Sequence, residues 1–447
     1  MINPPSKDYM HLTKRFGIVA VSQLPVQYAL ALKKLSPVGR VLRSSHEEVN
    51  RWHRALGRAV YLLLCLHTAF YLNYFVQNGI LGRRMTDLVP LLGAAAFAGL
   101  SALSATAVRA VRRRSYRVFF VTHLLVALAL PVFVISHHPS NTALYLAEAV
   151  ALFAVDLVLR KRRTFAAAAS LTPVPAPGPA DLVRIVIPVP HQQTMEEFRR
   201  TPGAHVYLSV PPASRRSSRL IFDFLFNPFT VAAVGDGDDP SLTIVARRRD
   251  GPLTRYLARL AEDAAGADAP ATVHLEVEGP YGCASRIADA LTGNRFDRVL
   301  LVAGGVGASF VVPLYRHMLA ENPSDARVRV VWAVRRASDA AWAVEGGGAD
   351  SILDDHRAQL FVTADGDADD DVGRRDGEFE MRRMRDRETS RPDLGKVVDE
   401  VFRRGAEERV AVLVCGPASM ARELRKHVGV WVAKGRTVFW HSEGFGW

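Results

Sequence analysis

The first third of the chain alternates long apolar runs with short polar loops. Four runs are long and apolar enough to cross a bilayer, at about 59–77, 88–110, 118–136 and 142–159. A fifth run, at 16–32, is marginal because it is short and contains glutamine and proline. The pattern therefore predicts an α-helical membrane domain over residues 1–165.

The pattern changes after this domain. Residues 166–180 contain most of the stretch TPVPAPGPAD, 172–181, whose prolines and glycine cannot continue a helix, so we predict a linker over 166–180. From 181 to 290, short β-type runs are separated by turn residues and interrupted by one helical segment, 253–263. Short strands at this spacing predict an antiparallel β-barrel.

The last part of the chain, 291–447, has a different rhythm. Apolar strands alternate with helices, which predicts a parallel, doubly wound α/β domain. Residues 364–393 are highly charged and poor in apolar side chains, so we expect a disordered insertion there.

The charge of the chain supports a membrane topology. Lysine and arginine number 57 against 45 acidic residues, a net charge of +12, and many arginines flank the apolar runs. The positive-inside rule places these basic loops, and with them the C-terminal two thirds, in the cytoplasm. The same topology puts the N-terminus outside with nothing visible to deliver it, so we expect upstream helices to be missing. No basic face interleaved with aromatics indicates nucleic-acid binding.

Histidines recur at one spacing in two of the apolar runs. His53 and His67 are 14 residues apart, as are His123 and His137. In a helix, 14 residues turn the chain by four turns less about 40°, so each pair lies on one face, roughly 21 Å apart along the axis. Because both helices run in one direction, His53 can face His123 near the cytoplasm and His67 can face His137 near the outside.

Two facing imidazoles at each level fit an iron that is ligated from both axial directions. The spacing therefore predicts two b-type haems stacked across the bilayer, with Arg54 and Arg58 beside the inner haem propionates. The alternative is that the histidines only hydrogen-bond neighbouring helices. Ionisable groups inside a membrane are costly, and two matched pairs favour the ligand role. His138 is an alternative to His137 that breaks the spacing.

Two short motifs in the barrel indicate a flavin. In the first, Pro228, Phe229 and Thr230, a phenyl ring can stack on the isoalloxazine and a hydroxyl can bond flavin or phosphate oxygens, although an ordinary core strand is the alternative. In the second, Gly251 and Thr254 open a helix whose free N–H groups can hold a phosphate. Threonine is also a common helix N-cap, which is the alternative there.

Glycines follow the first strand of the α/β domain. Gly304, Gly305 and Gly307 let the backbone approach a pyrophosphate and turn into a helix, without forming the full dinucleotide fingerprint. A tight strand–helix turn without a ligand is the alternative. Arg335, next to Arg336, can pair with a ribose 2′-phosphate and favour NADPH over NADH, or can simply be solvated.

A second turn closes another strand of the same domain. It contains Cys415, Gly416 and Pro417. Ligands in such folds bind at the carboxyl ends of the strands, so this turn is a candidate for the nucleotide site. The three cysteines of the chain are scattered and indicate neither a disulfide framework nor a metal site.

The order of these parts resembles the ferric reductase and NADPH oxidase superfamily, most closely the fungal ferric/cupric metalloreductases. The stretches HRALGRAVYLLLCLH and HLLVALALPVFVISH are similar to its haem helices, and GGVGASFVVP, CGP and EGPYG to its reductase motifs. NPFTVA resembles its flavin motif, which usually begins with histidine, so Asn227 departs from the pattern. The resemblance covers nearly the whole chain.

The resemblance implies a multi-domain membrane protein. A transmembrane haem bundle precedes a cytoplasmic ferredoxin-reductase-like module, composed of an FAD-binding β-barrel and an NADPH-binding α/β domain. It also implies that a C-terminal aromatic residue covers the flavin where nicotinamide enters, and the candidates are Phe445 and Trp447.

The implied activity is electron transfer across the membrane. NADPH in the cytoplasm would reduce FAD, and two b-type haems would carry electrons to an extracytoplasmic Fe(III) or Cu(II) chelate. We expect an integral plasma-membrane metalloreductase that supports iron or copper uptake and needs no acid–base catalytic residues, since cofactors carry the chemistry. The alternatives are a superoxide-generating NADPH oxidase and a non-catalytic membrane protein with a decayed reductase domain.

Overall fold

The computed structural model of the chain divides into two units, described separately: the helical unit, up to Arg163, and the C-terminal unit, from Thr164. The structure describes residues 7–42, 44–174, 181–212, 227–235, 240–265, 270–282, 284–293, 295–322, 325–343, 352, 355–363, 391–405 and 407–444. The predicted disordered insertion therefore lies almost entirely outside the described residues, as do Phe445 and Trp447.

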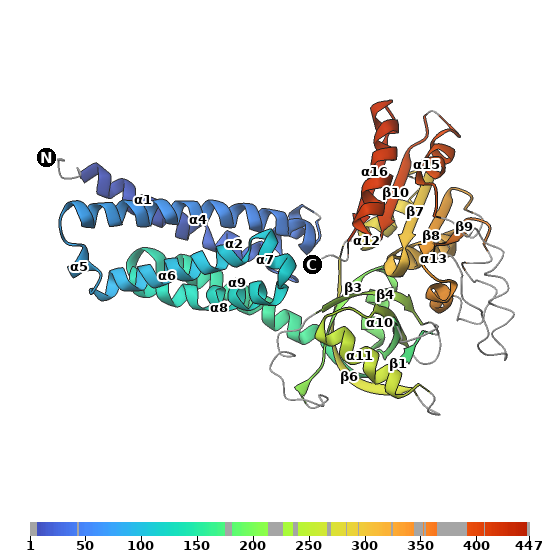
Figure 1. Ribbon diagram of the computed structural model, residues 1–447, viewed down its shortest axis with the longest axis horizontal. Coiled ribbons are helices and arrows are strands. Elements are labelled where there is room, and N and C mark those ends of the chain that lie inside the picture. Colours follow the sequence, from blue (N-terminus) through green and yellow to red (C-terminus); the bar gives the residue numbers. More distant parts are fainter. Residues whose placement is uncertain are drawn as a thin grey trace. The chain divides into compact units, whose positions relative to one another are not determined.

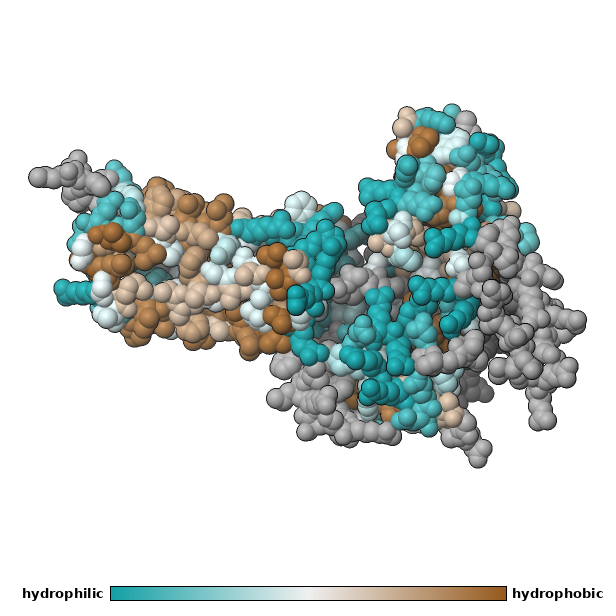
Figure 2. Space-filling view, in the orientation of Figure 1, coloured by the Kyte–Doolittle hydropathy of each residue, from teal (hydrophilic) through white to brown (hydrophobic). Residues whose placement is uncertain are grey.

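The helical unit contains the predicted spans. Its elements are α1 (Lys7–Ser22), α2 (Leu24–Ala29), α3 (Pro37–Val41), α4 (His46–Gln77), α5 (Leu81–Arg84), α6 (Leu88–Thr106), α7 (Arg109–Arg114), α8 (Tyr116–His137) and α9 (Pro139–Arg163). The helices α4, α6 and α8 and most of α9 are long and apolar enough to cross a membrane, which confirms the four predicted runs. Figure 2 shows the apolar side chains that these helices expose, which suit contact with lipid.

The marginal run at 16–32 is not one helix. It is divided at Gln23 between α1 and α2, and Pro25 lies in the first turn of α2. The chain after α2 is held by the buried carboxylate of Asp156 on α9, which accepts backbone N–H groups of Lys34 at 2.9 Å and Leu35 at 2.8 Å. This buried, charge-assisted contact fixes the end of α2 against α9.

The first domain of the C-terminal unit is a closed antiparallel barrel, as predicted. Its strands lie in the order β1-β2-β5-β4-β3-β6. Their bounds, with those of two helices, are β1 (Thr164–Pro173), β2 (Leu182–Pro188), α10 (Gln192–Arg199), β3 (His205–Ser209), β4 (Asn227–Val234), β5 (Ser241–Arg247), α11 (Pro252–Asp263) and β6 (Ala271–Tyr281). Buried leucine, isoleucine and valine side chains fill the interior.

The barrel begins earlier in the chain than the sequence indicated. The boundary predicted at 181 is wrong, because most of the expected linker, 166–173, belongs to β1. This strand is alanine-rich and has little intrinsic β preference. It is nevertheless fixed by pairing with both β2 and β6, which closes the barrel.

The second domain is the predicted α/β fold, with a parallel sheet in the order β11-β10-β7-β8-β9. Its elements are α12 (Ala284–Thr292), β7 (Arg298–Gly304), η3 (Gly305–Gly307), α13 (Ala308–Glu321), β8 (Val328–Val334), η4 (Ala337–Ala343), β9 (Ala358–Val362), α15 (Leu394–Phe402), β10 (Val410–Cys415), α16 (Ala418–Ala433) and β11 (Val438–Glu443). Figure 1 labels β10, β7, β8 and β9 of this sheet. Apolar clusters cover both faces of the sheet, which is why its central strands β7 and β10 are almost continuously apolar.

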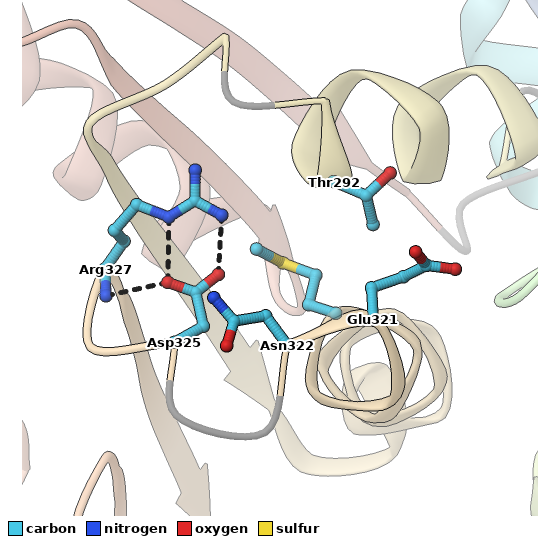
Figure 3. Close-up of a pocket in the computed structure, with 6 residues that line it drawn as sticks. Thr292, Glu321, Asn322, Asp325 and Arg327 are labelled. Atoms are coloured by element: carbon cyan, nitrogen blue, oxygen red, sulfur yellow. Dashed lines mark hydrogen bonds and ion pairs between the residues drawn. The ribbon is translucent and has the colours of Figure 1, made fainter.

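The same ion pair precedes two neighbouring strands of this sheet. Before β8, Asp325 accepts bonds from the guanidinium of Arg327 at 2.8 and 2.7 Å, as Figure 3 shows. Before β9, Asp355 is held by Arg357 at the same two distances and also accepts a hydrogen bond from the hydroxyl of Tyr315. These guanidinium contacts hold the pKa of each aspartate below its usual value, and that of Asp355 well below it.

The lowered pKa of Asp355 predicts an acid-sensitive contribution to stability. A carboxylate whose pKa is lower in the folded state stabilises the protein fully when the pH is above the unfolded pKa of about 3.9. This contribution to stability is lost as the pH falls below that value. We expect Asp355→Asn to cost about 2 kcal/mol at neutral pH and to reduce the loss of stability on acidification. Unfolding of the purified chain in detergent, followed by tryptophan fluorescence across this pH range, measures both effects.

The matched control is Glu196→Gln, which removes an exposed ion pair with Arg200. We expect it to change stability by less than about 1 kcal/mol. Equal effects of the two substitutions would contradict the role given to Asp355.

Candidate functional site

The structure brings His53 on α4 and His123 on α8 together. Their ring centroids lie 6.0 Å apart, with the ring planes inclined by 53°. An imidazole nitrogen binds a transition metal at about 2 Å, so two rings on opposite sides of one ion have centroids roughly 6 Å apart. The inner pair thus has the separation that the predicted ligand role requires.

Three of the four candidate histidines are fixed through Nδ1 to a backbone carbonyl. The acceptors are Gln27 O for His53 at 3.0 Å, Thr13 O for His67 at 2.8 Å and Val89 O for His137 at 2.7 Å. A carbonyl can only accept, so each Nδ1 carries the proton and each Nε2 keeps its lone pair. This is the arrangement of metal-ligating histidines, whose other ring nitrogen donates to a fixed acceptor.

The outer pair consists of His67 and His137, which lie within electrostatic range of each other. His137 is the last residue of α8 and its ring is half-buried, whereas the neighbouring His138 lies past the helix end and is exposed. The structure therefore favours the histidine that keeps the 14-residue spacing.

The donor set fits haem better than a bare metal ion. Among the described residues, no group of three or more histidine, cysteine, aspartate or glutamate side chains converges on one point. A structural zinc ion takes four protein ligands, whereas haem iron brings its own ring nitrogens and takes axial ligands from the protein. The Nδ1 of His123 is buried and has no hydrogen-bond partner in the described structure.

A basic residue that the sequence did not single out joins the inner pair. Arg112 on α7 lies close enough to Arg54 for their positive charges to repel, and the same holds for Arg58. Its guanidinium lies 5.7 Å from the centroid of Phe119, whose ring in turn lies 5.3 Å from that of His123. In sequence Arg112 is one of several loop arginines, and only the packing of α7 on α8 distinguishes it.

In the barrel, the predicted residues Pro228, Phe229 and Thr230 lie on β4. Thr230 is buried and pairs with His205 of β3, while Phe229 is partly buried against the barrel core. This position suits both a contact with flavin and an ordinary strand of the barrel core.

Aromatic residues of β3 and β6 gather beside this motif. The ring of Tyr207 lies 5.6 Å from His205 and 5.5 Å from Tyr281, and the Tyr281 hydroxyl donates to Glu278 at 2.7 Å. Sequence reasoning missed His205 and Tyr207, because their proximity to Tyr281 comes from strand register and not from spacing along the chain.

Gly251 and Thr254 begin α11 as expected, with Gly251 at the N-cap. The Thr254 hydroxyl accepts the backbone N–H of Arg249 at 3.2 Å and lies 3.1 Å from the carbonyl of the same residue. The side chain therefore closes its own turn, and the free N–H groups of the helix remain the groups suited to an anion.

The two glycine-containing turns of the α/β domain pack against each other. A Cβ at Gly307 would lie 2.0 Å from the carbonyl oxygen of Cys415, and one at Gly304 would lie 2.6 Å from Pro417 Cδ. A Cβ at Gly416 would likewise lie 3.0 Å from the backbone of Gly304. Backbone packing between the turns therefore requires these glycines, whether or not a ligand is bound.

Gly305 has a different role. Its φ of +56° is in the left-handed region, and its carbonyl accepts the indole N–H of Trp332 at 3.0 Å. The guanidinium of Arg247, which also pairs with the buried Asp339 at 3.6 Å, lies beside this glycine. Arg247 is thus a cation at the loop that the sequence did not indicate, while Arg335 is exposed after β8.

Cys415 is fully buried, and burial raises the pKa of its thiol well above the usual value. The thiol stays protonated, so the side chain packs in the core and only the backbone faces the neighbouring turn.

On the adjacent strand β11, His441 Nε2 lies 3.0 Å from a carboxylate oxygen of Glu443.

A pocket of about 250 Å³ lies at the opposite edge of the sheet (Figure 3). It is lined by Thr292, Met318, Glu321, Asn322, Asp325 and Arg327. These residues surround the amino end of β8, whereas cofactors in such folds bind at the carboxyl ends of the strands. We therefore assign no cofactor to this pocket.

The contact between the two turns predicts the effect of adding one methyl group. Gly307→Ala forces the turns apart, which we expect to destabilise the domain by roughly 1–3 kcal/mol and to slow flavin reduction by a nicotinamide nucleotide at least about tenfold. Stopped-flow flavin absorbance measures the rate. The control is Gly429→Ala on α16, where a Cβ meets open space and the rate should not change. A normal rate in Gly307→Ala would contradict this role of the contact.

Three family models match successive parts of the chain. Residues 16–134 match the ferric reductase like transmembrane component, residues 167–285 an FAD-binding domain, and residues 296–429 the ferric reductase NAD binding domain. The matches follow the helical unit, the barrel and the α/β domain in that order.

Curated relatives include a probable ferric reductase transmembrane component of Eremothecium gossypii, 26% identical over 75% of this chain and 48% of its own length. A probable metalloreductase AIM14 of Candida dubliniensis is 23% identical over 81% of this chain and 60% of its own. Ferric/cupric reductase transmembrane component 2 of Schizosaccharomyces pombe is 21% identical over 96% of this chain and 80% of its own. The chain spans about half to three fifths of the length of the first two. With this succession of domains, the chain belongs to the ferric reductase superfamily.

Proposed function

We propose that this protein is a metalloreductase that transfers electrons from cytoplasmic NADPH, through FAD and two b-type haems, to an Fe(III) or Cu(II) chelate on the other side of the membrane. The observation that carries the proposal is the arrangement of the four histidines. Two pairs lie on α4 and α8, and three of the four rings donate through Nδ1 to a backbone carbonyl, which leaves the lone pair on Nε2. The Nε2 of His53 lies 3.3 Å from the side-chain amide nitrogen of Gln27, a contact that a bound iron would replace.

The paired histidines define what the helical unit would do. Haem provides one-electron redox chemistry when bound, and FAD links it to the two-electron chemistry of a nicotinamide. His53, His67, His123 and His137 would hold the haem iron atoms through imidazole nitrogens at two depths of the helical unit. Arg54, Arg58 and Arg112 supply positive charge at the inner level, where it would balance haem propionates.

The orientation in the membrane follows from the basic residues. Arginines cluster on α7 and in the last turn of α9, which precedes the C-terminal unit. The positive-inside rule places these segments, and with them the flavin and nucleotide domains, in the cytoplasm. We place the protein in the plasma membrane, where an external metal chelate is accessible.

The choice of a metal as acceptor rests on the family. The relatives are named as ferric or cupric reductases and metalloreductases. Oxygen is the competing acceptor, and superoxide release measured with and without ferric chelate distinguishes the two.

The ligand assignment predicts a selective loss. His67→Ala or His137→Ala removes an outer axial ligand, so we expect the reduction of external ferric chelate to be abolished while NADPH still reduces the flavin at its normal rate. Chelate reduction and flavin absorbance measure the two steps, and reduced-minus-oxidised spectra report the haem content.

His138→Ala is the matched control, since it removes a neighbouring imidazole outside the pairs, and both steps should remain normal. A normal two-haem spectrum in His67→Ala would show that the ligand assignment is wrong.

The position of Arg335 predicts nucleotide preference. A charge-assisted contact with the 2′-phosphate is worth about 1.5–3 kcal/mol, so Arg335→Ala should lower kcat/KM for NADPH by roughly tenfold or more and leave NADH unaffected. Steady-state kinetics with both nucleotides tests this. Arg425→Ala, on the exposed face of α16, is the control. An equal fall with both nucleotides would contradict recognition of the 2′-phosphate.

A further inference from the structure

Two glycines lie directly against the outer histidines. A Cβ on Gly17 of α1 would lie 2.7 Å from Cε1 and 2.8 Å from Nδ1 of His67. A Cβ on Gly93 of α6 would lie at the same two distances from the same atoms of His137. In both cases the three nearest atoms all belong to the imidazole, so each ring rests on the bare backbone of a neighbouring helix.

Each glycine stands four residues after the carbonyl that binds the ring. Gly17 follows Thr13, the acceptor for His67, and Gly93 follows Val89, the acceptor for His137. In an α-helix the carbonyl of residue i already accepts the N–H of residue i+4. A second donor must approach the carbonyl from the side, past residue i+4, and the nearest obstacle there is the Cβ of that residue.

The inner pair does not need this device. His53 donates to the carbonyl of Gln27, which lies in the last turn of the short helix α2. Carbonyls in a last helical turn have no partner within the helix, so they are open to a side chain without a glycine beside them. The outer carbonyls lie inside longer helices, and there access depends on the missing side chain.

We propose that Gly17 and Gly93 are positioning residues for the outer haem ligands. Each gives one histidine access to a helical carbonyl, which keeps the proton on Nδ1, fixes the plane of the ring and leaves Nε2 as the nitrogen that would bind a haem iron. This inference rests on the proposed function, because it concerns the ligands of the outer haem. It assigns a supporting helix to each ligand helix: α1 to α4 and α6 to α8.

The conformation of these glycines argues against a backbone requirement. Neither has a positive φ. Alanine is the better helix former, so without the histidine a change to alanine would favour each helix. The obstacle to alanine at both sites is therefore the imidazole itself.

The test compares Gly17→Ala and Gly93→Ala with Gly99→Ala in purified full-length protein. Gly99 is on α6 as well, but a Cβ there meets only the methyl groups of Val126, at an ordinary 3.7 Å. We expect each of the first two variants to lose about half of the haem absorbance per flavin or to shift the midpoint potential and low-temperature EPR signal of one haem only. We expect Gly99→Ala to match the wild type in all three.

A double variant keeps the test decisive if Gly17→Ala is poorly folded. With the ring removed, the added methyl group has space, so His67→Ala/Gly17→Ala should be as stable as His67→Ala alone. If Gly17→Ala is equally harmful with and without the His67 ring, the glycine serves helix packing and the proposal is wrong.

The outcomes also separate this proposal from the one on which it rests. A wild-type protein without haem absorbance would refute the proposed function. A wild-type protein with two haems, together with Gly17→Ala and Gly93→Ala variants whose spectra and potentials match those of Gly99→Ala, would overturn only the role of the glycines.

Discussion

The helical unit depends on how four polar rings are accommodated inside an apolar environment. An imidazole within a bilayer is costly unless its polar atoms have partners. Three of the rings meet this requirement through a carbonyl of a neighbouring helix, so the helix that carries the histidine and the helix that supplies the carbonyl are fixed together. The packing of α1 on α4 and of α6 on α8 follows from the same contacts that set the direction of Nε2.

The C-terminal unit uses a different constraint, the close approach of backbone to backbone. The turns after β7 and β10 meet where only glycine fits, and the sheet order places these strands side by side. Both turns lie at the carboxyl edge of the parallel sheet, so their packing holds that edge together. Trp332 of β8 donates a hydrogen bond to the turn after β7, and Arg247 of β5 lies beside it.

In both units, therefore, a glycine is needed because it has no side chain, but the reason differs. In the sheet the missing Cβ lets two turns touch, and in the helical unit it lets a histidine reach a carbonyl already bonded within its own helix. The proposed electron path depends on both kinds of contact. The first shapes the edge where the nicotinamide would bind, and the second orients the ligands at the far end.

The sequence by itself determined the four long spans, the barrel, the parallel sheet and the 14-residue histidine spacing, because apolar length and periodicity are local properties. The sequence predicted a linker over most of β1, because an alanine-rich strand is stabilised by partners from distant parts of the chain. It could not identify Arg112, Arg247 or the His205–Tyr281 cluster, whose partners lie on other elements. Only the tertiary structure decided which carbonyl holds each histidine, because that depends on which helix packs beside it.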